Sequence, residues 1–487
     1  MAGKQGDCPV LDCIDHAGVD CAQFVENTVK AGLMQVRDKR ILVVGMGRSG
    51  MAAARLLSRA GARVTVNDRD PSGTHPDAEA ALSGLGVELI QGAHPEAAFV
   101  SAEGIVISPG VPVTLPPLQA ARKAGIPVIG ELELAAGFTT AVIVAVTGTN
   151  GKSTVTELTG AMLAASGKRV WVGGNLGTPL SAAVMASPQP DVVVVEVSSF
   201  QLDSIDTFRP HVAVLLNVTP DHLDRYDSMA AYQRSKRRVF ENQKPDDVAI
   251  LNMDDPWAAS LSDELIATVQ GYGAIPPGME GICLAAAKLV FSGTRQDRQS
   301  IPLSAAKLFG RHNQGNMAAA ALAALAAGAT DTGVRTALAT FSGLPHRIEY
   351  VGTAGNVAFY NDSKATNVDA VEKALNAFEM PVVLIMGGRD KNGDFSVLKD
   401  RVAQSVKTLI LMGEAANGIQ RQLEGVISGI RVADMDAAVQ AGYAAAGTDG
   451  VVLLSPGCAS FDMFQSYGHR GDVFRESVQT LIRQVRS

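Results

Sequence analysis

The run TGTNGKST at residues 147–154 is the most specific chemical signal in this chain. Its glycines allow backbone N–H groups to approach phosphate oxygens, Lys152 supplies a positive charge for the β- and γ-phosphates of a nucleotide, and the Ser153 hydroxyl can reach Mg²⁺. Val146 stands where the full GxxxxGK[ST] pattern has its first glycine, so the loop is a shortened relative of that pattern. The residues of this predicted phosphate-binding loop are Gly148, Thr149, Asn150, Gly151, Lys152, Ser153 and Thr154.

Two further groups of polar residues follow runs of β-branched residues. Glu196 ends a run of four valines, where a buried carboxylate needs a partner. Mg²⁺ beside Ser153 would be one partner, and an ion pair or a helix cap would be another. His222 shares its loop with Asp221 and Asp224, and this combination favours a second metal site over a lone structural histidine.

Lys236 lies in the basic run at residues 232–240, which has a helical pattern. By its charge pattern alone, this run predicts a solvated helix face. Its apolar and aromatic members, Tyr232, Val239 and Phe240, would form the buried stripe of the helix.

A second glycine-rich turn, Gly45-x-Gly47-x-x-Gly50, follows a predicted strand and opens a predicted helix. Taken alone, it predicts an NAD(P) site with Asp68, at the next strand end, on a ribose hydroxyl. Any ligand with a diphosphate could use the same backbone amides, and tight packing of strand on helix with no ligand is an equal alternative.

The elements that position these residues alternate between short β-branched runs and helical segments. Repeated strand–turn–helix units predict parallel sheets with right-handed crossovers, whose ligands bind beyond the carboxyl ends of the strands. The predicted strands are 40–44, 63–66 and 104–107 in a first block, and 141–146, 191–195, 211–216 and 248–251 in a second. The third block opens near residue 343, with strand ends at 360–364, 386–391, 412–414 and 455–460.

We therefore predict an α/β protein of three domains, each a mainly parallel sheet flanked by helices. A length of 487 residues suggests about three domains. The first and last would be Rossmann-like and the central one similar to P-loop ATPases. The predicted boundaries are a poorly ordered extension at 1–38, a first domain at 39–136, a central domain at 137–342 and a last domain at 343–487. The extension holds Cys8, Cys13 and Cys21, whose spacing matches no standard metal site.

The composition limits the function classes. A net charge of −7 argues against nucleic-acid and anionic-membrane partners, which would require a basic face. Five cysteines without a CxxC pair favour a reducing compartment, and the longest apolar run, at 317–329, is too short to span a bilayer. We expect a monomeric cytoplasmic enzyme with small-molecule substrates, no nucleic-acid partner and no membrane insertion.

Taken in order, these motifs resemble those of the Mur ligases, from about residue 39 to the end of the chain. The most specific runs are GGNLG at 173–177, GLPHRIE at 343–349, NDSKATN at 361–367 and SPGCASFDMF at 455–464. The resemblance implies an ATP-dependent amide ligase of peptidoglycan precursor synthesis. It points to the activity that adds D-glutamate to UDP-N-acetylmuramoyl-L-alanine through an acyl phosphate. The DNPR-type motif of the diaminopimelate-adding relatives is not seen.

The resemblance also implies a role for each domain. The first would bind the UDP end of the substrate rather than NAD, and the central one would bind ATP and two Mg²⁺ ions. The residues that match UDP-substrate contacts are Ser49, Asp68, Arg69, Gly110, Asn175 and Tyr232. Those that match ATP contacts outside the loop are Asn313, Asn316, Arg347 and Asp362, and those that match D-glutamate contacts are Lys364, Thr366, Lys391, Ser460, Phe461 and Tyr467. Tyr467 stands where the family pattern has phenylalanine.

The metal ligands and catalytic groups are implied in the same way. Ser153 and Glu196 match the ligands of one ion, and His222 and Lys236 match those of the other. In this family the matching lysine is carbamylated, which would turn a cation that repels Mg²⁺ into a carboxylate. Lys152, His222, Lys236 and Asp221 would be the catalytic residues, with Asp221 or His222 accepting a proton from the incoming amine.

Three other functions compete with this interpretation. A folylpolyglutamate synthase is a related ligase, but it should lack the first block. A dehydrogenase would use the GxGxxG turn for NAD(P). A nucleotide-binding regulator without catalysis would not need Lys152, Glu196, His222 and Lys236 together.

Overall fold

The structure is a computed structural model, and it describes residues 36–70, 82, 84–175, 177–222, 225–293, 300–308, 311–378, 380–390 and 393–486. Within these ranges the side chains of Arg311, His312 and Arg486 are not described. Most of the predicted N-terminal extension, with its three cysteines, lies outside the described residues.

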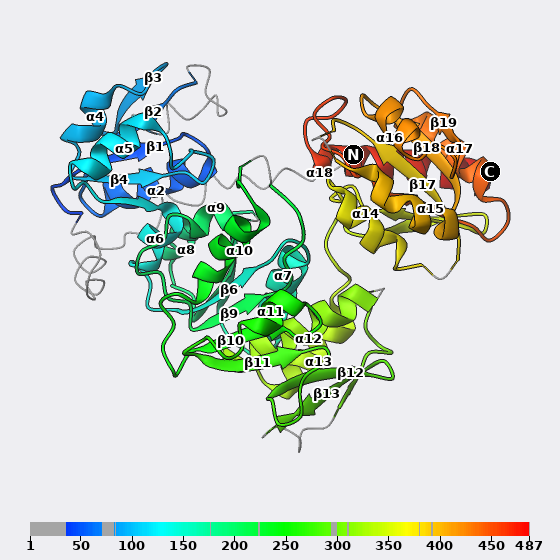
Figure 1. Cartoon of the computed structure of the whole chain (residues 1–487), viewed down its shortest axis with the longest axis horizontal. Helices are drawn as coiled ribbons and strands as arrows, with labels where there is room; N and C mark the ends of the chain where they lie inside the picture. The colour runs from blue at the N-terminus through cyan, green and yellow to red at the C-terminus, as the bar shows by residue number, and fades with distance from the viewer. Residues whose placement is uncertain are drawn as a thin grey trace, which may run out of the picture. The chain divides into compact units, whose positions relative to one another are not determined.

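The first sheet has five parallel strands in the order β3-β2-β1-β4-β5 (Figure 1). Its strands are β1 (Arg40–Val44), β2 (Arg63–Asp68), β3 (Glu88–Gln91), β4 (Gly104–Ile107) and β5 (Val128–Gly130). Its helices are α2 (Arg48–Arg59), α4 (Glu96–Ser101), α5 (Pro116–Lys123) and α6 (Glu131–Ala136). The predicted strands in this block are confirmed, and β3 and β5 are additions.

The central sheet has nine strands in the order β14-β13-β12-β11-β10-β9-β6-β8-β7. Its parallel part is β6 (Val142–Thr147), β7 (Val170–Gly174), β8 (Val192–Glu196), β9 (Val212–Leu215), β10 (Val248–Asn252), β11 (Thr268–Tyr272) and β12 (Gly281–Ala285). β13 (Lys288–Ser292) and β14 (Ile301–Pro302) add antiparallel pairs at one edge. The helices are α7 (Lys152–Ala165), α8 (Leu180–Val184), α9 (Ser199–Leu202), α10 (Met229–Arg237), the 3₁₀ turn η1 (Arg238–Phe240), α11 (Pro256–Ser260), α12 (Arg311–Ala326) and α13 (Asp331–Thr340).

The last sheet has six strands in the order β15-β16-β20-β17-β18-β19, of which only β15 is antiparallel to its neighbour. Its strands are β15 (Glu349–Ala354), β16 (Val357–Asn361), β17 (Val382–Gly387), β18 (Val406–Met412), β19 (Gly429–Arg431) and β20 (Val451–Leu454). Its helices are α14 (Val368–Leu375), η3 (Phe395–Leu398), α15 (Lys399–Ser405), α16 (Ala416–Gln422), α17 (Met435–Ala446) and α18 (Tyr467–Arg486).

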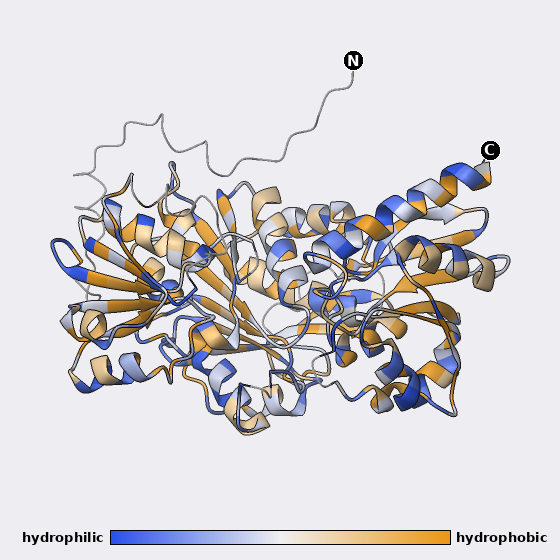
Figure 2. Ribbon diagram, turned by 90° about the horizontal axis from the view of Figure 1, so that it is seen from above, coloured by the Kyte–Doolittle hydropathy of each residue, from blue (hydrophilic) through white to orange (hydrophobic). Residues whose placement is uncertain are grey.

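Hydrophobic side chains fill both faces of this last sheet. Along β17, Leu384 and Met386 belong to one core cluster, while Val383 and Ile385 belong to the other. Alternate residues of a strand point to opposite faces, so a strand that is apolar at every position needs helices on both sides. Figure 2 shows the same pattern, with hydrophobic strands and hydrophilic turns. The three sheets confirm the predicted fold class.

Two buried glutamates of α6 explain how the chain divides into units. The Glu133 carboxylate accepts the backbone N–H groups of Asp206, Thr207 and Phe208 at 2.8–2.9 Å, and Glu131 accepts the N–H of Ser181 at 2.6 Å. By Cα proximity, the first unit comprises the described parts of Met1–Val142, Gly173–Val193 and Ser198–Arg209. The second comprises those of Ile143–Val172, Val194–Val197 and Pro210–Ser487. The domain boundaries at 136 and 342 stay predictions.

Every helix in the described part of the chain is too short or too polar to cross a membrane.

Candidate active site

The phosphate-binding loop joins β6 to α7, which begins at Lys152. Gly151 has φ +87°, and a Cβ there would lie 2.5 Å from the side-chain oxygen of Asn316 on α12. A glycine is therefore required on both conformational and steric grounds. The Asn316 amide donates to Asn313 at 2.9 Å, so the structure brings both predicted ATP contacts of α12 together beside the loop.

Two ammonium groups are directed at the backbone of this loop. Lys152 Nζ donates to the carbonyl oxygens of Gly148 at 2.9 Å and Thr149 at 2.8 Å. Lys236 Nζ donates to the same Gly148 oxygen at 2.8 Å. Burial lowers the pKa of Lys152, and the nearby Glu196 carboxylate partly opposes that shift. Positive charge is thus gathered where a phosphate chain would lie.

Ser153, Glu196 and Arg347 form a short chain of contacts at the start of α7. The Ser153 hydroxyl donates to Glu196 Oε2 at 2.5 Å, and the Arg347 guanidinium donates to Ser153 Oγ at 2.6 Å. A hydroxyl beside a buried carboxylate offers the hard oxygen ligands that Mg²⁺ prefers. In the described part of the chain, no three His, Cys, Asp or Glu side chains cluster as a metal site would require. The Ser153 hydroxyl and the Glu196 carboxylate are two oxygen ligands, and this number fits an ion that is held jointly by the protein and by nucleotide phosphates.

Tyr232 lies between His222 and Lys236. Its ring centroid is 6.3 Å from that of His222 and 4.6 Å from Lys236 Nζ, and its hydroxyl is 3.2 Å from Thr149 Oγ1. The imidazole Nε2 of His222 is 3.7 Å from Asp221 Oδ2. The structure therefore brings the predicted catalytic residues 221, 222 and 236 to one side of the loop, and it places Tyr232 there rather than in the pocket described below.

The burial of Lys236 corrects one prediction. Charge pattern alone predicted a solvated face for residues 232–240, but Lys236 is only 1% exposed. Its neighbours Arg234 and Arg237 are the exposed members of this run, while Tyr232 and Phe240 are buried as predicted. A buried ammonium is costly, so Lys236 requires a functional or electrostatic reason.

Asp362 is buried at the end of β16. It accepts hydrogen bonds from the Ser455 hydroxyl at 2.9 Å and from Ile348 N at 3.3 Å. Burial raises the pKa of Asp362 to about 7, and Ser455 and Arg347 partly offset this. Arg347 itself is flanked by two non-glycine residues with positive φ, His346 at +64° and Ile348 at +44°.

The predicted D-glutamate contacts gather at the carboxyl ends of β16, β20 and β17, which are neighbours in the last sheet. Gly457 N donates to the carbonyl of Ala365 at 2.9 Å, which ties the segment of Lys364 and Thr366 to that of Ser460. Lys364 Nζ lies 3.9 Å from the ring centroid of Tyr467. Ser460 is buried and Phe461 is 65% exposed, whereas Lys391 lies outside the described residues.

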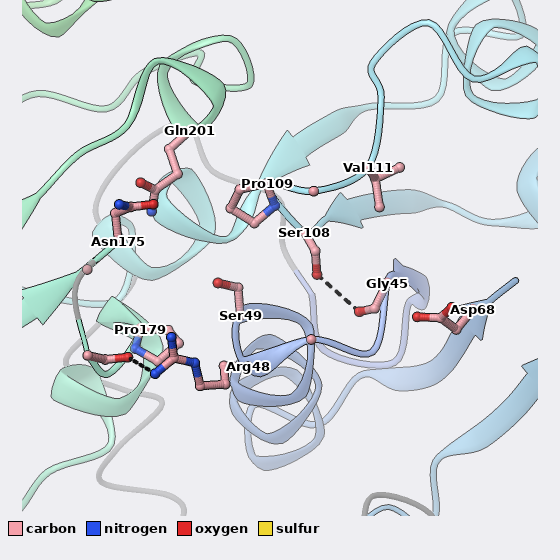
Figure 3. Close-up of a pocket in the computed structure, with 14 residues that line it drawn as sticks. Gly45, Arg48, Ser49, Asp68, Ser108, Pro109, Val111, Asn175, Pro179 and Gln201 are labelled. Atoms are coloured by element: carbon pink, nitrogen blue, oxygen red, sulfur yellow. Dashed lines mark hydrogen bonds between the residues drawn. The ribbon is translucent and has the colours of Figure 1, made fainter. Parts of the chain in front are cut away.

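A pocket of about 440 Å³ opens in the first unit (Figure 3). Its lining residues are Gly45, Gly47, Arg48, Ser49, Asp68, Ser108, Pro109, Gly110, Val111, Gly174, Asn175, Gly177, Pro179 and Gln201. Four of the predicted UDP contacts, Ser49, Asp68, Gly110 and Asn175, are therefore in one pocket. Arg69 and Tyr232 do not belong to its lining.

Two glycines of the GxGxxG turn, Gly50 and Gly47, serve different structural purposes. A Cβ at Gly50 would lie 1.8 Å from the carbonyl oxygen of Gly45, so Gly50 is required by packing. A Cβ at Gly47 would meet no atom within 4 Å, which leaves space beside the pocket for a ligand. Asp68 accepts Met46 N at 2.6 Å and Asp70 N at 2.9 Å, so both of its oxygens already bind backbone amides.

Several lining residues were not predicted as contacts, among them Arg48, Ser108 and Gln201. Arg48 donates to the carbonyl of Gly177 at 3.0 Å, and Ser108 donates to that of Gly45 at 3.0 Å. Figure 3 shows both contacts, with Gln201 beside Asn175. Arg48 is one of three variable positions of the turn and Ser108 follows β4, so their positions beside the glycines and at a strand end were the available signals.

Family models match the chain over three stretches. These are the N-terminal domain of MurD-like Mur ligases over residues 39–130, the Mur ligase middle domain over 146–324 and the Mur ligase glutamate ligase domain over 346–458. The chain belongs to the Mur ligase family, whose members are ATP-dependent ligases.

Individual relatives narrow this class. The UDP-N-acetylmuramoylalanine--D-glutamate ligase of Desulfosudis oleivorans is 45% identical over 450 residues, which cover 92% of this chain and 98% of that protein. The protein of the same name from Desulfatibacillum aliphaticivorans is 46% identical over 448 residues, covering 92% and 100%. Among solved structures, the pseudomurein peptide ligase type C of Methanothermus fervidus has a TM-score of 0.58 at 21% identity, covering 91% and 100%. That last likeness concerns the fold.

Proposed function

We propose that this protein is an ATP-dependent ligase that adds D-glutamate to UDP-N-acetylmuramoyl-L-alanine in peptidoglycan precursor synthesis. The observation that carries the proposal is an identity of 45% to a ligase of that name across 92% of this chain. The phosphate-binding loop, the pocket of the first unit and the clustered strand ends of the last sheet give each of the three substrates a candidate site.

The reaction proceeds in two balanced steps. A carboxylate oxygen of the L-alanine residue attacks the γ-phosphorus of ATP, the bond from that phosphorus to the bridging oxygen breaks, and ADP leaves. The neutral amine of D-glutamate then attacks the acyl carbon, the C–O bond to phosphate breaks, and inorganic phosphate leaves. One proton passes from the amine to a base, for which Asp221 and His222 are both placed beside the loop.

The residues of the loop supply charge and position. Attack of an anion on a polyphosphate requires neutralised charge, and the Lys152 ammonium provides it at the start of α7. Asn313, Asn316, Arg347 and Asp362 would hold the adenosine and phosphates of ATP. Ser49, Asp68, Arg69, Gly110 and Asn175, with Tyr232, would hold the UDP substrate, and Lys364, Thr366, Lys391, Ser460, Phe461 and Tyr467 would hold D-glutamate.

Two Mg²⁺ ions complete this proposal. Bound Mg²⁺ supplies electrostatic neutralisation of the transferring phosphoryl group. Ser153 and Glu196 would hold one ion. His222 and Lys236 would hold the other, provided that Lys236 is carbamylated, because the unmodified ammonium donates a hydrogen bond and cannot bind a cation.

We further infer that the enzyme acts in the cytoplasm as a monomer, with domains at 39–136, 137–342 and 343–487. The cysteine pattern fits a reducing compartment, and the candidate residues for every substrate lie in this one chain. Size-exclusion chromatography with light scattering tests the monomer, since a mass near twice 50.7 kDa would contradict it.

The decisive experiment measures phosphate release with ATP, UDP-N-acetylmuramoyl-L-alanine and a panel of D- and L-amino acids. Activity with D-glutamate alone is expected, and reactions without the UDP substrate provide the baseline. Activity with L-lysine or diaminopimelate but not D-glutamate would overturn the proposal. Calorimetric titration of UDP and NADH into the same protein separates the dehydrogenase alternative, because only a dehydrogenase requires nicotinamide.

A further inference from the structure

Arg470, near the start of α18, is one of the most deeply buried charged side chains in the described part of the chain. It is 2% exposed, yet it was not singled out by any sequence motif. Its guanidinium Nε donates to the Ser363 hydroxyl at 2.9 Å, and its terminal nitrogens donate to the Ser363 carbonyl at 2.8 Å and the Cys458 carbonyl at 3.1 Å. Weaker contacts reach the carbonyls of Gly387 and Ala459, each at 3.4 Å.

These acceptors belong to three different strand ends. Ser363 follows β16, Gly387 ends β17, and Cys458 and Ala459 follow β20. In an open parallel sheet, the loops after adjacent strands form the ligand site. One guanidinium, with its five N–H donors in a rigid fork, therefore joins the ends of three strands. The loops after two of them, β16 and β20, carry described candidate D-glutamate contacts.

The contacts continue from Arg470 to those candidate residues. The Ser363 hydroxyl, which accepts from Arg470, donates to the carbonyl of Tyr467 at 2.8 Å. The ring of Tyr467 lies 3.9 Å from the ammonium of Lys364, the residue after Ser363. On the other side, Ala459 precedes Ser460 and exchanges two backbone hydrogen bonds with Arg389, at 2.8 and 3.0 Å.

Among the described residues, Arg470 has no direct ion pair with a carboxylate. Its acceptors among the described residues are all carbonyl or hydroxyl oxygens. Burial lowers the pKa of Arg470 to about 10, with Cys458, Asp462 and Asp362 opposing the shift, so the side chain stays protonated at neutral pH. Arg470 is therefore a buried positive charge at this end of the sheet whose described hydrogen-bond acceptors are all neutral, with the negative charges of Asp362 and Asp462 acting on it at longer range.

We propose that Arg470 is the positioning residue of the acceptor site: it fixes the loops of Lys364 and Ser460 and supplies positive potential that favours a dicarboxylate acceptor. This inference rests on the proposed function, because it assigns D-glutamate to the ends of β16, β17 and β20. Arg470 contacts loops rather than substrate, so it acts through the residues that it holds.

Two substitutions of Arg470 separate the effect of its branched set of hydrogen-bond donors from the effect of its positive charge. Arg470→Lys keeps the charge but cannot hold three loops, and Arg470→Met keeps the length and removes the charge. We expect the KM for D-glutamate to rise roughly 10-fold in Arg470→Lys and roughly 100-fold in Arg470→Met, because hydrogen bonds to charged groups carry such factors. The KM values for ATP and for the UDP substrate should stay within about twofold in both.

Arg475 provides the matched control on the same helix. It pairs with Glu349 at 3.0 Å and with Asp472 at 2.6 Å, and within the described part of the three loops it has no hydrogen-bond or ion-pair partner. Arg475→Lys should lower the melting temperature without a selective change in any KM. If Arg470→Met does not fold, the KM values of Arg470→Lys alone test whether Arg470 positions the acceptor site.

The results can refute the proposed function and the positioning role of Arg470 separately. A wild-type protein without D-glutamate-dependent phosphate release would refute the proposed function itself. A wild-type protein that is active with D-glutamate, together with an Arg470→Lys variant in which all three KM values change equally or none changes, would refute the positioning role. A selective rise in the KM for D-glutamate supports it.

Discussion

The carbonyl oxygen of Gly148 accepts hydrogen bonds from two ammonium groups, those of Lys152 and Lys236. Both cations are therefore held by the loop itself in this structure. Phosphate oxygens are better acceptors for an ammonium than a neutral carbonyl, because the bond is then between opposite charges. Separate variants test the role of Lys152 in ATP turnover and the carbamylation of Lys236.

Lys152→Ala should lower ATP turnover by roughly 100-fold or more, which is the usual cost of removing one group that stabilises the transition state. The fold should remain, since the ammonium of Lys152 donates to two loop carbonyls and has no other hydrogen-bond partner among the described residues. Phosphate release and circular dichroism measure the two properties. Lys168→Ala, an exposed lysine beyond the end of α7, is the control, and near-normal turnover by Lys152→Ala would exclude the loop from catalysis.

Lys236→Ala tests the carbamate. Removal of a carbamylated lysine takes away a carboxylate, and short-chain carboxylic acids can occupy the space that it leaves. We expect activity to fall strongly and to recover in part with added acetate or propionate, measured as phosphate release. Lys152→Ala under the same additions should not recover, and a Lys236→Ala variant that also shows no recovery would count against the carbamate.

The raised pKa of Asp362 predicts that the stability of the folded protein depends on pH. Its pKa is raised from near 4 to about 7, so the folded protein binds more protons than the unfolded chain between these values. Its contribution to stability is therefore complete below about pH 4 and is lost as the pH rises through 7, by at most about 4 kcal/mol. Melting temperatures at pH 5 and pH 8 should show wild type losing stability relative to Asp362→Asn, and parallel curves would contradict this.

At the scale of elements, the buried parallel strands were predictable from the sequence. β6, β8, β9 and β10 are continuous β-branched or aliphatic runs, as expected of strands covered on both faces. Strands at or next to a sheet edge were not predictable: β13, with the sequence KLVFS, alternates buried and less buried positions, and β3 is only four residues long. Short, half-polar strands resemble loops unless the neighbouring strand is known.

Some residues of the candidate site were recognisable from the sequence and others were not. Glu196 was recognisable because a carboxylate after four valines has no ordinary place in a strand, and the structure puts it against Ser153. Lys236 and Arg470 were not recognisable as buried, because a basic residue on a helix usually faces solvent. Their burial depends on loops from distant parts of the chain, which local sequence patterns do not reveal.

The start of α2 gives a prediction at the element scale. Arg48 is the only cationic side chain among the described residues that line the pocket, at a helix N-terminus that already favours anions. Arg48→Ala should raise the dissociation constant for UDP roughly tenfold while leaving that for uridine unchanged, because uridine has no diphosphate. Calorimetry measures both constants.

Arg122→Ala is the matched control for this variant. Arg122 also donates to a backbone carbonyl, that of Val113 at 3.1 Å, but it does not line the pocket. An equal loss of UDP and uridine affinity in Arg48→Ala would show that Arg48 only supports the fold of the pocket.

At the scale of the whole molecule, the proposed reaction requires movement. The described candidate D-glutamate contacts lie at the end of the last sheet, whereas the acyl phosphate would form at the loop of the central sheet. The amine must reach the acyl carbon, so we expect the domains to close when ligands bind. Small-angle X-ray scattering should record a smaller radius of gyration with a non-hydrolysable ATP analogue, Mg²⁺ and the UDP substrate than without them.

The Lys152→Ala variant provides the control for closure, since it should bind the analogue poorly and change less. An unchanged radius of gyration in wild-type protein, at ligand concentrations where calorimetry shows full binding, would contradict the expected movement.

The pocket of the first unit draws its lining from both sides of the predicted boundary at residue 136. Part of the lining comes from residues between 45 and 111. The rest comes from the end of β7 and from the segments after β7 and β8 of the central sheet, with Gly174, Asn175, Gly177, Pro179 and Gln201. The two buried glutamates of α6 hold these segments in the first unit. A transplanted first domain that ends at residue 136 would therefore carry an incomplete pocket. In a chimera between two relatives of this family, recognition of the UDP substrate should follow the segments at 173–193 and 198–209 as well as the domain that bears the glycine-rich turn.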